Sequence, residues 1–108
     1  MYKCKIADQT DMGHEVHDFG VKDTRGRAIG AKVYYREIEL VEFTPEQYQV
    51  YYALPAGYYY VATMRATRNG ADYGASQPRK YFTTEAERDA AVAKYLKQAR
   101  SRALKLAA

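Results

Sequence analysis

Apolar side chains recur every three or four positions over the last part of the chain. They are Val92, Tyr95, Leu96, Ala99, Ala103 and Leu106. This spacing is that of one face of an α-helix. Upstream, Thr84-Glu85-Ala86-Glu87 places a threonine three residues before a glutamate, the capping box that satisfies backbone N–H groups at a helix start. The pattern predicts a long helix over 85–108 that packs through one face.

A second capping box occurs at Thr44-Pro45-Glu46-Gln47, where proline occupies the first helical position. Leu54-Pro55-Ala56-Gly57 follows shortly afterwards and interrupts helical structure. The sequence therefore predicts a short helix near 45–53.

Between these helices, the run 58–68 is rich in Tyr, Val and Thr and ends at Asn69-Gly70, a strong hairpin signal. A two-residue turn there pairs Arg68 with Ala71, Thr67 with Asp72, Ala66 with Tyr73 and Met64 with Ala75. Tyr60, Ala62, Met64 and Ala66 are then predicted to face the core. Tyr59, Val61, Thr63, Arg65 and Thr67 are predicted on the outer face, with Arg65 near Thr63, Thr67 and either Arg79 or Tyr34. A third strand is predicted over 79–82 after Pro78.

The N-terminal half shows the same alternation around residues 23–27. A three-residue loop, Thr24 to Gly26 with positive φ at Gly26, aligns Val21 with Ile29 and Phe19 with Ala31, and it pairs Asp23 with Arg27. Apolar residues occupy odd positions up to Tyr35 but even positions at Ile38 and Leu40, which predicts a β-bulge near Arg36. Residues 2–6 alternate as an edge strand protected by lysines.

These elements predict one α+β domain over 1–108: an antiparallel sheet of about five strands packed by the long C-terminal helix, with the short helix at an edge. At 47% hydrophobic and 28% charged residues, the composition excludes a disordered chain. No apolar run approaches the roughly 18 residues that a membrane span requires, and the first residues lack the apolar stretch of a signal peptide. With a single cysteine, Cys4, we expect a cytoplasmic protein without membrane contact.

Positive charge is concentrated in the C-terminal half. Residues 1–56 carry seven Lys/Arg and nine Asp/Glu, a net charge of −2, whereas residues 57–108 carry ten and four, a net charge of +6. The last fifteen residues hold five cations and no acid: Lys94, Lys97, Arg100, Arg102 and Lys105. Such a stretch attracts phosphate backbones. Cations near a helix C-terminus also complement the helix dipole, so both interpretations stand.

Twelve tyrosines are present, several of them adjacent: Tyr34-Tyr35, Tyr51-Tyr52 and Tyr58-Tyr59-Tyr60. In a strand, at least one member of each such group points away from the core. Tyrosine beside arginine on an open sheet stacks bases and contacts phosphates. Half-buried tyrosines with wet hydroxyls, or a homodimer interface, explain the same pattern.

Residue chemistry argues against catalysis and against a metal. His14 and His17, with Asp11, Asp18 and Cys4, are the only group resembling metal ligands, and a His-x-x-His spacing in a strand puts the two rings on opposite faces. The acids are scattered, no nucleophile–base set is evident, and the glycines fit no phosphate loop. We expect no enzyme, no cofactor and no metal site.

The segment from Gly57 to Leu104 resembles the three-stranded-sheet-plus-helix module of phage integrase arm-binding domains, a layout that plant ethylene-response DNA-binding domains share. The resemblance rests on Gly57-Tyr58-Tyr59-Tyr60-Val61-Ala62, the Asn69-Gly70 turn, and Arg79-Lys80-Tyr81-Phe82-Thr83-Thr84-Glu85-Ala86-Glu87 leading into a helix. In those families the sheet lies in the DNA major groove. By position, the resemblance implies a DNA-facing set of Tyr59, Val61, Thr63, Arg65, Thr67, Arg79 and Tyr81.

Together these features predict a small, non-enzymatic nucleic-acid-binding accessory protein, with DNA as the expected ligand and a phage or mobile element as the expected origin. The predicted contact residues are Tyr59, Thr63, Arg65, Thr67, Arg79, Tyr81, Lys94, Lys97, Arg100, Arg102 and Lys105. The alternative is a protein-interaction or inhibitor module that binds a partner, or a second copy of itself as a homodimer, through its Tyr-rich sheet.

Overall fold

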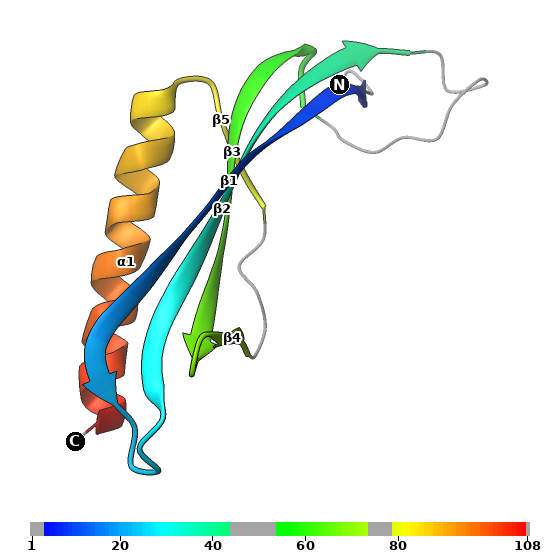
Figure 1. Cartoon of the computed structure of the whole chain (residues 1–108). Coiled ribbons are helices and arrows are strands. Elements are labelled where there is room, and N and C mark those ends of the chain that lie inside the picture. The colour runs from blue at the N-terminus through cyan, green and yellow to red at the C-terminus, as the bar shows by residue number, and fades with distance from the viewer. Residues whose placement is uncertain (1–3, 44–53, 74–78, 108) are drawn as a thin grey trace.

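The computed structural model describes residues 4–43, 54–73 and 79–107, which form an antiparallel sheet with one helix against one face (Figure 1). The elements are β1 (Cys4–Lys22), β2 (Ala28–Glu42), β3 (Gly57–Arg68), β4 (Ala71–Asp72), β5 (Lys80–Phe82) and α1 (Glu85–Ala107). The strand order is β1-β2-β3-β4, and β5 also pairs with β3. The predicted α+β class, the five-stranded antiparallel sheet and the long C-terminal helix are confirmed. The predicted short helix near 45–53 lies outside the described residues.

Helix α1 begins where the capping pattern predicts. The Thr84 hydroxyl oxygen accepts a hydrogen bond from the backbone N–H of Glu87 at 3.2 Å. Val92 and Ala103 are buried, and Val92 packs against Val33, Ala62 and Met64 of the sheet. The apolar stripe therefore buries one side of the helix, although Leu106 at its end stays exposed.

The β3–β4 hairpin has the predicted turn and register. Asn69 and Gly70 both have positive φ, 51° and 80°, as a type I′ turn requires. Arg68 pairs with Ala71 and Thr67 with Asp72. The predicted strand over 79–82 is also present, because β5 pairs antiparallel with β3. The predicted pairing of Met64 with Ala75 lies outside the described residues.

The β1–β2 hairpin is partly as predicted. Val21 pairs with Ile29, the Asp23 backbone N–H donates to the Arg27 carbonyl oxygen at 2.9 Å, and Gly26 has φ of 78°. The prediction that Phe19 faces Ala31 is wrong, since His17 occupies that position. The cause lies in β1, whose register shifts between Asp18 and Val21.

The described part of the predicted edge strand over 2–6 belongs to β1, which lies at an edge of the sheet and continues to Lys22. Its register shifts between Ile6 and Asp8, between Asp11 and His14, and between Asp18 and Val21. At the last two shifts an aspartate side chain accepts the N–H of a positive-φ glycine two residues on, Asp11 with Gly13 and Asp18 with Gly20, each at 2.8 Å. These Asp-x-Gly bulges let a mostly exposed strand follow the twist of β2.

The bulge predicted near Arg36 in β2 is wrong. The pairing of β2 with β3 runs without a shift from Ile29/Arg68 to Leu40/Gly57. The apolar residues of β2 change from odd to even positions because the two ends of the strand are buried on opposite faces of the sheet. Val33 is buried beneath α1, whereas Ile38 and Leu40 are buried on the opposite face with Cys4, Tyr59 and Val61.

The described residues therefore form two apolar clusters, one on each side of the sheet. The second cluster lies where β1 begins and β2 ends, a part of the sheet that extends away from α1 (Figure 1). Ala62 and Met64 face the helix as predicted. The outer-face assignment of β3 fails at Tyr59 and Val61, which a second cluster buries. Among the described residues no helix combines the length and the apolar character that crossing a membrane requires.

Candidate nucleic-acid interface

Three arginines surround a hollow on the sheet face opposite α1. Arg36 comes from β2, Arg65 from β3 and Arg79 from the residues just before β5, and Tyr34 and Thr63 complete the lining of about 260 Å³. These residues share a face because Tyr34 pairs with Thr63, while their neighbours Val33 and Met64 pair beneath the helix. We call this site the arginine hollow.

A carboxylate from β4 borders the arginine hollow. Asp72 of β4 accepts a hydrogen bond from the Tyr34 hydroxyl at 3.0 Å, and the same oxygen lies 3.5 Å from Nη1 of Arg65. Its other carboxylate oxygen lies 3.8 Å from Nζ of Lys32. Burial, followed by the Asp72 contact, raises the pKa of the Tyr34 hydroxyl. Tyr34 therefore stays neutral and is fixed in place.

The electrostatics of the arginine hollow favour an anion. Guanidinium groups are charged at all ordinary pH values and repel one another across a small space. The Arg65 side chain remains 45% exposed, and its guanidinium carbon lies 5.9 Å from the centroid of the Tyr34 ring. Planar guanidinium donors suit phosphate and carboxylate oxygens. Thr63, Arg65 and Arg79 of the predicted contact set are thus brought together.

The other predicted sheet residues lie elsewhere. Tyr59 is only 8% exposed, donates its hydroxyl proton to the Pro55 carbonyl at 2.7 Å, and packs edge-on against Tyr81 at 6.3 Å between ring centroids. Thr67 is 3% exposed. Their predicted placement on an open, ligand-facing surface is corrected: Tyr59 and half-buried Tyr81 belong to the second apolar cluster, and Thr67 is enclosed opposite Gly30 of β2.

The predicted basic residues of the helix are exposed, and Arg102 at the flank also lines a small pocket between helix and sheet with Ile29 and Ala103. Lys94, Lys97, Arg102 and Lys105 line one stripe with Gln98 and Ser101. Arg100 is exposed but is not part of this stripe. The stripe points away from the sheet, whereas the arginine hollow opens on the far face of the sheet. The structure therefore separates the two predicted basic surfaces by both layers of the fold.

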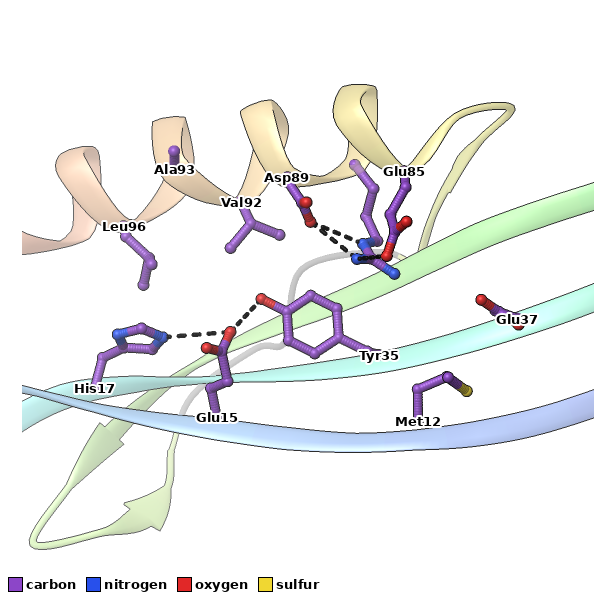
Figure 2. Close-up of a pocket in the computed structure, with 11 residues that line it drawn as sticks. Met12, Glu15, His17, Tyr35, Glu37, Glu85, Asp89, Val92, Ala93 and Leu96 are labelled. Atoms are coloured by element: carbon purple, nitrogen blue, oxygen red, sulfur yellow. Dashed lines mark hydrogen bonds and ion pairs between the residues drawn. The ribbon is translucent and has the colours of Figure 1, made fainter.

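A third surface has the opposite charge (Figure 2). A groove of about 630 Å³ runs between α1 and strands β1 and β2, and its walls carry Glu15, Glu37, Glu85 and Asp89. Figure 2 shows the Tyr35 hydroxyl directed at Glu15, to which it donates a hydrogen bond, and His17 on the other side of that carboxylate. Burial, followed by the Glu15 contact, raises the pKa of Tyr35. We call this feature the acidic groove, and its charge repels a phosphate backbone.

Arg88 anchors the acidic groove and was not among the residues predicted from sequence. It is 8% exposed, lies 3.0 Å from Asp89 and 3.3 Å from Glu85, and stacks 4.8 Å from the Tyr35 ring centroid. Its position four residues before Val92 continues the apolar stripe of the helix, which is the sequence signal that identifies a buried arginine here.

The histidines and the cysteine do not converge. His14 lies against Tyr34 at 5.6 Å between ring centroids, whereas His17 lines the acidic groove, so the two rings are on opposite faces of the sheet. Cys4 is buried, and burial raises the pKa of its thiol, which disfavours the nucleophilic thiolate. Within residues 4–43, 54–73 and 79–107 no group of three or more His, Cys, Asp or Glu side chains is arranged to hold a metal ion.

Comparison of the chain with protein-family models, with curated proteins and with solved structures finds no match. The resemblance to integrase arm-binding domains therefore stays a prediction. The segment has the expected order of strand, Asn-Gly turn, strand, strand and helix. Strand β5 pairs with β3, and β4 has two residues.

Proposed function

We propose that this chain is a small, non-enzymatic nucleic-acid-binding accessory protein, with DNA as the expected ligand, and that the arginine hollow is its main contact with phosphate. The observation that carries the proposal is the convergence of Arg36, Arg65 and Arg79 from separate segments of the chain. The resemblance of residues 57–104 to integrase arm-binding domains supports DNA and an origin in a phage or mobile element.

The surroundings of the arginine hollow favour a role of its arginines in ligand binding over a role in solubility alone. Exposed arginines that only aid solubility are normally dispersed, because crowding them raises the electrostatic energy. Here strand pairing fixes the backbone of Arg36 and Arg65, so the side chains start from rigid positions. A phosphate that binds among them removes the repulsion and gains charge-assisted hydrogen bonds.

Fluorescence anisotropy with labelled single-stranded DNA, duplex DNA and RNA, each carrying a 5′-phosphate, tests the proposal. We expect binding that weakens steeply with salt, because phosphate contacts release counterions. Arg65→Ala should reduce affinity by about 1–3 kcal/mol and flatten the salt slope by about one unit, with little change in the thermal midpoint.

Arg25→Ala is the matched control, since it removes one exposed cation from the β1–β2 loop, roughly 20 Å along β2 from Tyr34. It should leave affinity nearly unchanged. An equal loss of affinity in Arg65→Ala and Arg25→Ala would show that binding depends only on the net charge of the protein. The absence of salt-dependent binding to all three nucleic acids would contradict the proposal.

The acidic groove favours a second candidate function, a protein-interaction module. Its helix wall is apolar at Val92, Ala93 and Leu96, and exposed Met12 of β1 lines its other wall. An apolar wall beneath a rim of carboxylates suits a partner that carries basic and apolar side chains. Binding of a protein partner, or self-association, that changes little between low and high salt would favour this function over the first.

A further inference from the structure

One side of α1 carries a line of residues whose charge changes sign along the helix. The line follows the three- and four-residue spacing of a helix surface and consists of Glu85, Asp89, Ala93, Leu96, Arg100 and Leu104. All of them are exposed except Leu96, which is half-buried. The first four form part of the helix wall of the acidic groove, whereas Arg100 and Leu104 lie beyond it. We call this line the helix seam.

The helix seam is complementary to itself when a second copy is turned end over end. A two-fold axis at the level between residues 94 and 95 relates two antiparallel helices, and every contact across it then occurs twice. Asp89 of each copy faces Arg100 of the other, since both lie equally far from the axis along the helix. Ala93 faces Leu96 for the same reason. Opposite charges therefore meet on both sides of a small apolar centre.

The charged groups of the helix seam have capacity for such contacts. Asp89 and Glu85 lie 3.0 Å and 3.3 Å from Arg88 of their own chain, but both carboxylate side chains remain more than half exposed. A carboxylate accepts several hydrogen bonds, so each can take a second cation. Among the residues that the structure describes, no carboxylate lies within ion-pair distance of Arg100. A second copy supplies the missing partner.

Exposed apolar side chains lie where this arrangement buries them. Met12 of β1 and Leu104 of α1 are 52% and 55% exposed. Figure 2 shows Met12 at the end of the acidic groove where Glu85 lies. Across the two-fold axis Leu104 faces Glu85, so Leu104 of a second copy arrives beside Met12 and both lose contact with water. Near the axis, the small side chain of Ala93 lets the two helices approach closely.

We propose that the chain forms a homodimer through the helix seam, with the two α1 helices antiparallel and Asp89 of each copy paired with Arg100 of the other. The second copy covers the acidic groove and is thus its partner. This inference goes beyond nucleic-acid binding, because the arginine hollow lies on the sheet face opposite α1 and takes no part in the dimer. The contact follows about 28 Å of one helix. Such a limited interface is typical of a weak dimer, with a Kd of about 10–100 µM.

Analytical ultracentrifugation of the full chain over a concentration series, without nucleic acid, tests the proposal. The unmodified protein should convert from monomer to dimer with the Kd given above. Arg100→Asp places two acids opposite each other at both symmetric contacts, so it should raise the Kd about tenfold or more. Lys94→Asp is the matched control, since it makes the same change of charge on the outer basic stripe of the same helix. It should leave the Kd nearly unchanged.

Mixing two variants tests the pairing itself. Asp89→Arg and Arg100→Asp should each be monomeric where the unmodified protein is dimeric, because like charges face each other. An equimolar mixture should form a heterodimer, since both contacts then join an arginine to an aspartate. Asp89→Arg also removes a contact of Arg88, so its thermal midpoint is compared with that of the unmodified protein. Ala93→Arg keeps that contact, suits a helix, and should dissociate the dimer by its bulk at the axis.

Three results would overturn the inference. One is a monomer at every concentration up to about 1 mM. Another is a dimer that Arg100→Asp and Ala93→Arg leave unchanged, or folded single-site variants that fail to associate when mixed, either of which would exclude the helix seam as the interface. The third is a monomer whose acidic groove binds a basic amphipathic peptide, with binding lost in Asp89→Arg. None of these results bears on the proposed function, because no nucleic acid is present.

Discussion

Three tyrosine hydroxyls among the described residues donate hydrogen bonds to carboxylates on other strands. Tyr34 bonds Asp72, Tyr35 bonds Glu15 and Tyr58 bonds Glu37. Such a bond stabilises the neutral phenol, and the Glu37 contact raises the pKa of Tyr58 to about 12. These tyrosines thus link strands, and the carboxylate at each of them limits how much of the ring remains for a ligand.

The Asp72 carboxylate contacts Arg65 and Lys32, and under the proposed function it competes with a bound phosphate for these two cations. Asp72→Asn keeps a side-chain acceptor for the Tyr34 hydroxyl but removes the negative charge. We expect the affinity for nucleic acid to rise several-fold, because one repulsive charge at the arginine hollow disappears. Anisotropy at two salt concentrations measures this, and the gain should shrink at high salt. Weaker binding by the variant would instead show that Asp72 orients Arg65 for the ligand.

Asp23 organises the β1–β2 loop and makes its stability depend on pH. Its carboxylate accepts the backbone N–H groups of Arg27 and Arg25 at 2.9 Å and the Arg27 guanidinium Nε–H at 2.9 Å. The Arg27 backbone bond is the leading cause of a lowered pKa at this carboxyl, outweighing its partial burial. A lowered folded-state pKa stabilises the fold above the ordinary aspartate value of about 3.9, and that stabilisation is lost as pH falls through the folded-state value.

Thermal midpoints at pH 7 and pH 3 should therefore differ more for the unmodified protein than for Asp23→Asn, which lacks the titrating group. An equal drop in both proteins would assign the acid sensitivity to other carboxyl groups.

Turn chemistry determines the geometry of the β3–β4 hairpin and through it the position of Asp72. Asn69 also reaches across to β2, where its side-chain oxygen accepts the Ala28 N–H at 3.1 Å. The hairpin therefore connects the β1–β2 loop with the edge of the arginine hollow. Its two-residue turn needs positive φ at both central positions.

A β-branched residue at position 70 cannot adopt this backbone without strain. Gly70→Val should destabilise the protein by about 1–3 kcal/mol, measured by denaturant unfolding. Ala71→Val, a substitution at the next position with extended backbone and an exposed side chain, serves as the control and should have little effect. An unchanged midpoint for Gly70→Val would mean that the turn in solution differs from the type I′ geometry.

At the scale of the whole molecule, charge is divided among three surfaces. The arginine hollow lies on one side of the sheet, the basic stripe of α1 lies on the outer side of the helix, and the acidic groove runs between helix and sheet. A short strand bound at the arginine hollow cannot also reach the basic stripe, because both layers of the fold lie between them.

The double variant Lys97→Ala/Arg102→Ala tests this separation. Binding of a strand of about five nucleotides should be unchanged, while a strand long enough to wrap around the molecule should bind more weakly and with a shallower salt slope. Anisotropy with both lengths measures the difference. A loss of affinity for the short strand would show that the helix, and not the arginine hollow, is the main contact.

Local chemistry in the sequence determined a large part of this fold. The period of the apolar residues after Glu85, the Thr84 cap, the Asn69-Gly70 turn and the pairing of Val21 with Ile29 all depend on residues close together in the chain. Thr63 and Arg65 share a face because they lie two residues apart in one predicted strand, and the pairing of the short strand β5 with β3 places Arg79 beside them.

The tertiary structure alone decided which faces of the sheet are covered. Alternation with period two assigns side chains to two faces but does not say which face is buried, and here α1 covers Val33 on one face while Cys4, Ile38 and Leu40 enclose Tyr59 on the other. The bulges of β1 and the position of Arg36 beside Arg65 depend on pairing between segments that are far apart in the sequence. Tyr59 and Thr67 are buried rather than exposed as predicted, because burial depends on how the whole molecule packs.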